Sequence, residues 1–180
     1  MQTSRILVSV AVSVFAVATS VQAQKEMSDS QYTAQALSAA PKAVAAEASV
    51  ARMDKDGSMR TLRTGKNGFT CMVIVKDKMC SDANGMEFFQ AMMKKEPPSD
   101  KAGISYMLAG DNGASNTDPL APSKTADNHW IVTGPHIMLF GPATKTLGYT
   151  EAKDPDPKLP YIMWAGTPYA HAMIPVGSSK

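Results

Sequence analysis

Short apolar runs interrupted by glycine and proline limit what the second half of this chain can fold into. They are GISYMLAG, HWIVTG, HIMLFG, YIMWAG and HAMIPV, at residues 103–110, 129–134, 136–141, 161–166 and 171–176. Runs of about four to eight apolar residues between turn signals are typical of buried strands rather than of helices. We therefore predict a mainly β second half, with a long polar loop at residues 111–128.

The first half mixes strands with helices. Three further strands, joined by the turn signals DKDG and GKNG, are predicted at SVARM (49–53), SMRTLR (58–63) and FTCMVIV (69–75). Long helices do not alternate with these strands, as they would around a parallel doubly wound sheet. The pattern predicts an α+β fold with an antiparallel or mixed β-sheet.

Residues 82–98, DANGMEFFQAMMKKEPP, carry the signals of one well-defined amphipathic helix. Asp82 or Asn84 can cap its start, and two prolines follow its end, so we expect a helix at about residues 84–96. Four apolar side chains recur at helical spacing and predict one buried stripe: Phe88, Phe89, Met92 and Met93.

The alanine-rich residues 29–47 favour a helical segment whose start Asp29 or Ser30 can cap. Pro41 should break or kink this segment, or begin a second short helix. A partly disordered arm is the alternative. The chain is thus predicted to have three parts: a signal peptide at 1–23, a helical or partly disordered arm at 24–47, and a single globular α+β domain at 48–180.

The N-terminus has the three regions of a secretory signal peptide. Arg5 supplies the positive charge, and residues 6–18 (ILVSVAVSVFAVA) form an apolar run. Val21 and Ala23 are small residues at the −3 and −1 positions of a cleavage site. The apolar run is shorter than the about 20 residues of a transmembrane helix, and an uncleaved anchor is the alternative. We predict a periplasmic or secreted protein that is cleaved after Ala23.

Cys71 and Cys80 are the two cysteines of the chain. Exported proteins fold in oxidising compartments, where a pair of cysteines usually forms a disulfide. We therefore predict a Cys71–Cys80 bond that closes the intervening segment as a loop. A cysteine-ligated metal ion and a catalytic thiol are the alternatives.

The charge of the mature chain is close to balanced. Cleavage removes 23 of 180 residues and one of the 18 Lys and Arg residues, so 17 remain against 16 Asp and Glu. Binding to nucleic acid is not expected, because it would require a clustered basic face. No second apolar run reaches membrane length, so we expect a soluble protein without stable membrane insertion.

Several longer strings resemble a family of small uncharacterised exported bacterial proteins. They are NGFTCM (67–72), MC (79–80), ASNTDP (114–119), WIVTGPHIMLF (130–140) and PYIMWAGTPYAHAMIPV (160–176). The resemblance covers roughly residues 48–176 and implies a single exported domain. It implies no activity, cofactor or catalytic residue.

Catalytic signatures are mostly absent. The chain has no Gly-x-Ser-x-Gly, no His-Glu-x-x-His and no glycine-rich phosphate loop. A serine or aspartate could still meet His129, His136 or His171 in the folded protein. A hydrolase-like enzyme is therefore the third hypothesis, after non-enzymatic roles, and no catalytic residue is assigned.

Two His-x-Met pairs, His136 with Met138 and His171 with Met173, are the clearest lead to a site. Residues i and i+2 of a strand face the same side of a sheet, so each pair projects together. If the two strands are neighbours, two imidazoles and two thioethers converge, and this ligand set favours copper, above all Cu(I). Trp164 and the adjacent Met163 would shield the ion. The alternative is core packing, with methionine as filler and each histidine held by a hydrogen bond.

Binding of an envelope partner or a small ligand is a further hypothesis. The loop at residues 111–128 would line a groove together with four aromatic side chains that are expected to be exposed: Trp130, Tyr149, Tyr161 and Tyr169. The sequence therefore indicates an exported protein with a binding or structural role, with periplasmic copper binding as the alternative.

We expect the exported protein to begin at Gln24, because the small residues Val21 and Ala23 fit a cleavage site directly before it. N-terminal sequencing of the mature protein checks this expectation. A mature chain that still starts at Met1 would contradict it.

Overall fold

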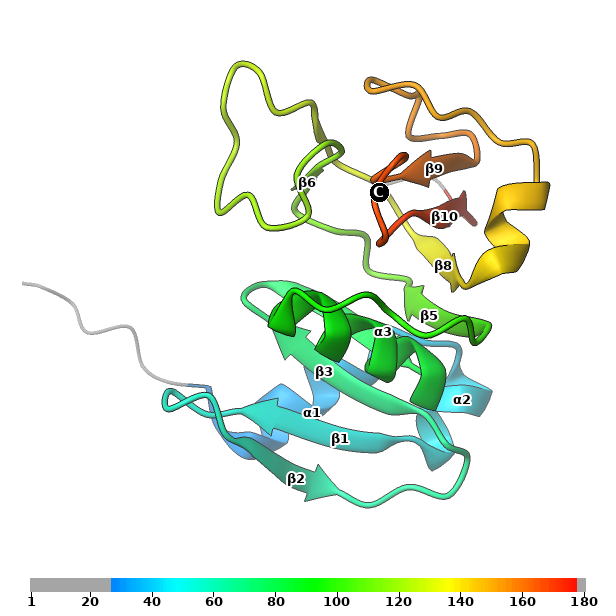
Figure 1. Cartoon of the computed structure of the whole chain (residues 1–180). Helices are drawn as coiled ribbons and strands as arrows, with labels where there is room; N and C mark the ends of the chain where they lie inside the picture. Colours follow the sequence, from blue (N-terminus) through cyan, green and yellow to red (C-terminus); the bar gives the residue numbers. More distant parts are fainter. Residues whose placement is uncertain (1–26, 178–180) are drawn as a thin grey trace, which may run out of the picture.

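An eight-stranded sheet organises this protein (Figure 1). In the order in which they lie side by side, the strands are β2 (Met59–Arg63), β1 (Ser49–Met53), β3 (Thr70–Ile74), β4 (Asp77–Ser81), β5 (Gly103–Met107), β8 (His136–Phe140), β10 (His171–Pro175) and β9 (Tyr161–Met163). Neighbouring strands pair antiparallel except β1 and β3, which are parallel. The predicted α+β fold with a mixed sheet is therefore confirmed.

The computed structural model describes residues 27–177. The predicted signal peptide and its cleavage after Ala23 lie outside the described residues. Within the predicted loop at 111–128 and just after it, two short strands, β6 (Ala114–Ser115) and β7 (Trp130–Ile131), pair with each other. The rest of that loop has no regular structure beyond turns and bends.

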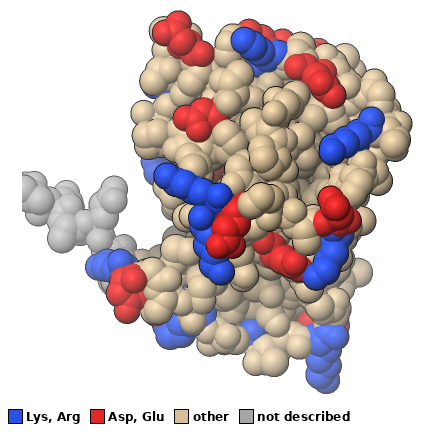
Figure 2. Space-filling model, viewed as in Figure 1, with Lys and Arg blue, Asp and Glu red and all other residues tan. Residues whose placement is uncertain are grey.

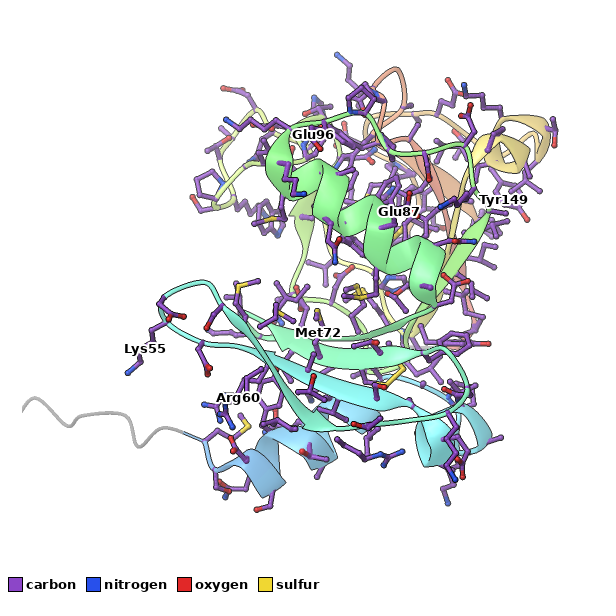
Figure 3. The ribbon with its side chains drawn as sticks, turned by 60° about the horizontal axis from the view of Figure 1, so that its bottom comes forward. Lys55, Arg60, Met72, Glu87, Glu96 and Tyr149 are labelled. Carbon is purple, nitrogen blue, oxygen red and sulfur yellow. A yellow bond between two sulfur atoms is a disulfide. The ribbon has the colours of Figure 1, made fainter. Side chains whose placement is uncertain are left out.

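Helices cover both faces of the sheet. The α-helices of the described chain are α1 (Asp29–Leu37), α2 (Lys42–Glu47) and α3 (Ala83–Lys94), and a 3-10 helix, η1 (Pro142–Thr146), follows β8. Helix α1 packs against β3 and β4, and α3 packs against β4 and β5 (Figure 1). Side chains of β3 alternate between them, since Cys71 lies in the core on the α1 side and Met72 in the core on the α3 side (Figure 3).

The predicted helical segment near the N-terminus is confirmed by α1 and α2. The cap of α1 is Ser28, one residue earlier than expected, and its hydroxyl accepts a hydrogen bond from the backbone N–H of Gln31. Tyr32 ties α1 to the sheet, because its hydroxyl accepts from the N–H of Val73 at 2.9 Å and donates to the carbonyl of Ala51 at 3.1 Å. Residues 29–47 are therefore part of the packed fold.

Helix α3 starts and stops at the predicted signals. Asp82 caps it by accepting a hydrogen bond from the N–H of Gly85 at 2.7 Å. Its end is marked by Lys95, whose backbone is left-handed with φ of 60°. The helix therefore runs from residue 83 to 94, so it begins one residue before the predicted range of about 84–96 and ends two residues before its end.

The apolar stripe of α3 is narrower than predicted. Phe88 is buried and stacks on Phe140 of β8, with 4.3 Å between ring centroids. Phe89 and Met92 are partly buried against the same core. Met93 is 66% exposed, so the prediction that it belongs to the buried stripe is wrong. At 3.6 residues per turn, Met93 is rotated by about 140° from Phe88 around the helix axis, so it faces solvent.

The predicted disulfide between Cys71 and Cys80 is present, and both residues are fully buried. They are direct partners in the β3–β4 ladder. The segment that the disulfide closes is thus a β-hairpin, and its first strand, β3, lies within the predicted strand at 69–75. Strand β4 was not predicted, because it begins with Asp77 and Lys78, which interrupt the apolar pattern that marks the other strands.

Acidic and basic side chains are interspersed on the face of the molecule that Figure 2 shows, with no large patch of one sign. None of the helices in residues 27–177 is both long and apolar enough to cross a membrane.

Reduction of the disulfide should lower the free energy of unfolding by about 2–3 kcal/mol, because the cross-link restricts the unfolded chain over a short loop. Urea unfolding of the wild type with and without a phosphine reductant measures the difference. The matched control is Cys71→Ala/Cys80→Ala, which should match the reduced wild type to within about 1 kcal/mol and be insensitive to the reductant. Equal midpoints for oxidised and reduced wild type would contradict the prediction.

Candidate functional site

The four His and Met residues of the predicted site lie on two neighbouring strands. Strand β8 carries His136 and Met138, and β10 carries His171 and Met173. The two strands pair antiparallel, with Met138 as the direct partner of Met173. The structure therefore brings together two segments that the chain separates by residues 141–170.

All four side chains are buried in the core between the sheet and α3. The exposed fractions are 0% for His136, 5% for Met138, 1% for His171 and 1% for Met173. Because alternate residues share a face, each histidine stands two positions from the methionine of its own strand. The antiparallel direction puts the two histidines at opposite ends of the methionine pair, four positions apart along the paired strands.

Each histidine is held by the same type of hydrogen bond. Nδ1 of His136 lies 2.7 Å from the carbonyl oxygen of Gly134, and Nδ1 of His171 lies 3.0 Å from that of Tyr169. A carbonyl oxygen can only accept, so Nδ1 donates in both rings and Nε2 keeps a free lone pair. Both Nε2 atoms are buried and have no hydrogen-bond partner in the described part of the chain.

Two buried imidazole nitrogens without a hydrogen-bond partner in one core are an unusual and costly arrangement. A buried acceptor without a partner costs about 1–3 kcal/mol. The same geometry, with one ring nitrogen donating to a carbonyl and the other free, is the one that orients metal-ligating histidines. In both His136 and His171, Nδ1 is thus engaged by a carbonyl and the lone pair of Nε2 stays free.

Burial keeps the two imidazoles neutral. Desolvation lowers the pKa of His136, although the bond to Gly134 and the charge of Asp77 act in the opposite direction. Desolvation, together with the charge of His136, lowers the pKa of His171 to about 4. Near neutral pH both rings are therefore in the deprotonated form that metal ions bind.

Aromatic rings enclose the imidazole of His171. The centroid of the Trp164 ring lies 4.8 Å from that of His171, the Phe140 ring 5.3 Å and the Phe88 ring 5.7 Å. These rings come from the residue after β9, from β8 and from α3. The His171 end of the cluster is therefore apolar and closed to water on those sides.

The His136 end carries a carboxylate. Oδ2 of Asp111 lies 4.0 Å from Nε2 of His136, which is too far for a hydrogen bond. Oδ1 of Asp111 accepts from the backbone N–H groups of Thr133 and Gly113 at 2.8 and 3.0 Å. Burial raises the pKa of Asp111 to about 6. Sequence reasoning missed Asp111 because GDNG after β5 reads as an ordinary turn.

Thioethers surround the cluster. Six methionines are buried in the core on the α3 side: Met72, Met79, Met107, Met138, Met163 and Met173. Met107 of β5 is the ladder partner of His136, so His136 has a methionine beside it on the next strand as well as on its own. The α3 side of the sheet is therefore rich in soft sulfur donors, both on the strand that carries His136 and on the neighbouring strand β5.

His129, the third histidine, lies apart from this cluster. Its Nδ1 is 2.8 Å from Oδ2 of Asp154, in a partly exposed position. The hydrogen bonds of the three histidines go to Asp154 and to two backbone carbonyls, so no Ser–His pair of a hydrolase is formed in residues 27–177. The same residues contain no group of three or more His, Cys, Asp and Glu that could hold a metal ion. A metal ion between β8 and β10 would therefore need the thioethers.

The aromatic groove predicted beside the loop at 111–128 is not formed as expected. Tyr161 is fully buried, and its hydroxyl lies 2.8 Å from Oγ1 of Thr133. Its expected exposure is wrong because pairing of β9 with β10 places Tyr161 beside Met173 in the core. The other three aromatic residues of the prediction are half-buried: Trp130, Tyr149 and Tyr169.

Two shallow surface depressions lie elsewhere, beside α1 and β2, where Asp29 and Arg60 line both. These two residues form an exposed ion pair, with Nη1 of Arg60 2.7 Å from Oδ2 of Asp29. An exposed pair of this kind contributes little to stability. The depressions are open to solvent and carry no arrangement of donors comparable to that between β8 and β10.

Comparison of this chain with protein-family models, with curated proteins and with solved structures finds no match. The resemblance to small exported bacterial proteins therefore stays a prediction. The function has to be inferred from the residues of the site.

The buried His171 should make the metal-free protein less stable in acid. Its pKa is lowered in the folded state, so the unfolded chain binds the proton more tightly. Stability is then complete above the unfolded pKa of about 6.5 and is lost as the pH falls toward the folded value. Between pH 7.5 and 4.5 this residue should remove about 2–3 kcal/mol of unfolding free energy.

Urea unfolding of wild type and His171→Gln at both pH values isolates this effect, because the other titrating groups, including Asp111, are common to the two proteins. The stability difference between wild type and variant should shift by about 2–3 kcal/mol in favour of the variant at pH 4.5. A difference that does not change with pH would contradict the assignment of a buried neutral His171.

Proposed function

We propose that this protein binds Cu(I) between β8 and β10, through Nε2 of both histidines and the thioether sulfurs of both methionines. The ligands would be His136, Met138, His171 and Met173. The observation that carries the proposal is the pair of buried, bare Nε2 atoms at either end of the Met138–Met173 ladder pair. One ion held by both lone pairs would remove the cost of two unsatisfied acceptors.

The chemistry of the donors supports copper in its reduced state. Thioether sulfur is a soft ligand that selects Cu(I), and imidazole also suits copper. Structural zinc sites are usually built from thiolates and imidazoles, and calcium sites from oxygen atoms. The sulfur atoms of Cys71 and Cys80 are joined to each other on the opposite face of the sheet, so they do not compete as ligands.

The two imidazoles of the proposed site are oriented before any ion binds. The backbone carbonyls of Gly134 and Tyr169 fix the orientation of the two imidazoles. Met138 and Met173 stand on paired strands of the sheet, which are more rigid than loops. A preorganised site of this kind spends little binding energy on ordering side chains.

The proposal includes an exported location, in the periplasm or outside the cell. The signal-like residues 1–23 and the disulfide between Cys71 and Cys80 support it, because disulfides persist in oxidising compartments. Free thiolates are readily oxidised there, whereas buried thioethers are protected by their surroundings. A site made of imidazole and thioether therefore suits a protein that holds copper outside the cytoplasm.

Removal of either ligand pair should abolish tight binding of Cu(I). Wild type is expected to bind one Cu(I) per chain, and both Met138→Leu/Met173→Leu and His136→Gln/His171→Gln should lose at least about 100-fold in affinity, since each variant lacks two ligands. Anaerobic competition with a chromophoric Cu(I) chelator measures the affinities. Ascorbate as the reductant leaves the disulfide intact.

The chain offers matched controls for both variants. Met53 and Met59 are also ladder partners, in β1 and β2, but are 51% and 47% exposed. Met53→Leu/Met59→Leu removes the same number of sulfur atoms and should bind like wild type, and so should His129→Gln. Similar affinities for all five proteins would refute the proposed site.

A further inference from the structure

Trp164 has a backbone conformation that is rare for a large side chain. Its φ is 56°, in the left-handed region, and only 6% of its surface is exposed. Such a conformation is a strained outlier for a bulky residue, and it persists only where the surroundings enforce it. Strained residues of this kind cluster at active sites and ligand clamps.

The segment around β6 holds Trp164 in place. Its indole Nε1–H donates to the carbonyl oxygen of Ser115 at 2.7 Å, and its backbone N–H donates to Oδ1 of Asn116 at 3.4 Å. Its own carbonyl accepts from the hydroxyl of Thr167 at 2.8 Å. The backbone of Trp164 is therefore held from two separate parts of the chain, and its indole is held by the carbonyl of Ser115.

The clamp places the indole against one ligand of the proposed site. The ring planes of Trp164 and His171 meet at 69°, with 4.8 Å between centroids. Phe140 and Phe88 cover other sides of the imidazole. The carboxylate of Asp111 stands at the opposite, His136 end of the cluster. An ion bound to Nε2 of His171 would thus be surrounded by aromatic rings at this end.

We propose that Trp164 is a binding residue that covers the metal ion with its indole ring, and that the aromatic enclosure makes the site selective for monovalent soft ions, Cu(I) and Ag(I). This inference rests on the proposed Cu(I) site. Tryptophan gives the strongest cation–π attraction of the aromatic side chains, and the attraction grows when the cation is desolvated.

Selectivity for a single charge follows from the same enclosure. The cost of moving an ion from water into an apolar environment rises with the square of its charge. Neutral rings and neutral ligands at the His171 end compensate little of that cost. The site therefore excludes a divalent ion such as Zn(II) more strongly than it excludes Cu(I) or Ag(I).

The chain has two tryptophans, so substitution of Trp130 lets the fluorescence of Trp164 report on ion binding. Trp130 is half-buried on β7, and its Nε1–H donates to the carbonyl of Asn112 at 3.4 Å, outside the proposed site. Trp130→Phe leaves Trp164 as the only tryptophan, and its emission should change in proportion to bound Cu(I) or Ag(I) up to one ion per chain. Zn(II) at the same concentration should produce no change.

Affinity provides the second readout. Trp164→Leu should weaken Cu(I) and Ag(I) binding about tenfold, a loss within the range of a desolvated cation–π contact, and Trp164→Phe should recover part of it. Trp130→Phe should stay within about twofold of wild type. The emission experiment leaves Trp164 unchanged, so it tests whether Trp164 contacts the ion even if the Trp164 variants fold poorly.

The outcomes separate this inference from the proposed function. If Trp130→Phe binds one Cu(I) without any change in Trp164 emission, and Trp164→Leu keeps the affinity of wild type, Trp164 is not a binding residue while the four-ligand site stands. A Zn(II) affinity equal to that for Cu(I) overturns the selectivity. Failure of wild type to bind Cu(I) or Ag(I) overturns both proposals.

Discussion

The antiparallel register of β8 against β10 is the constraint on which the core of this protein depends. It makes Met138 and Met173 partners and turns His136 and His171 toward the same interior. A slip of one residue would exchange this set for side chains of the other face, because the side-chain period of a strand is two. Helix α3 closes the interior through the stack of Phe88 on Phe140. Site and core are thus one structure, since the same ladder that packs the methionines positions the imidazoles.

The two faces of the sheet separate two kinds of sulfur chemistry. On the α1 side, Cys71 and Cys80 form a disulfide that joins β3 to β4. On the α3 side, the thioethers remain as weak donors around two neutral imidazoles. The two ends of that cluster also differ, with a buried carboxylate near His136 and aromatic rings around His171. Under the proposed function, the thioether and imidazole donors favour a soft cation over a hard one.

Most of the fold follows from local patterns. The strands at 49–53, 136–140 and 171–175 and helix α3 coincide with apolar periodicity and with capping and stop signals that act within a few residues. Strand β4 has no such pattern, since Asp77 and Lys78 lie at its start and its place is decided by pairing with β3. The same reason explains Tyr161, which the sequence suggests is exposed and which its ladder with β10 buries. Long-range pairing overrides local composition at these positions.

The sequence by itself determined that His136 shares a face with Met138, and His171 with Met173, because the two-residue period of a strand depends only on local backbone geometry. Only the tertiary structure decided that the two faces meet, because strand order and register depend on contacts across residues 141–170. Tertiary structure also decided that both Nε2 atoms are left bare, that Asp111 stands at one end and that Trp164 covers the other. Asp111 follows β5, and the carbonyl that holds the Trp164 indole comes from β6, and the chain places both segments far from either His-x-Met pair.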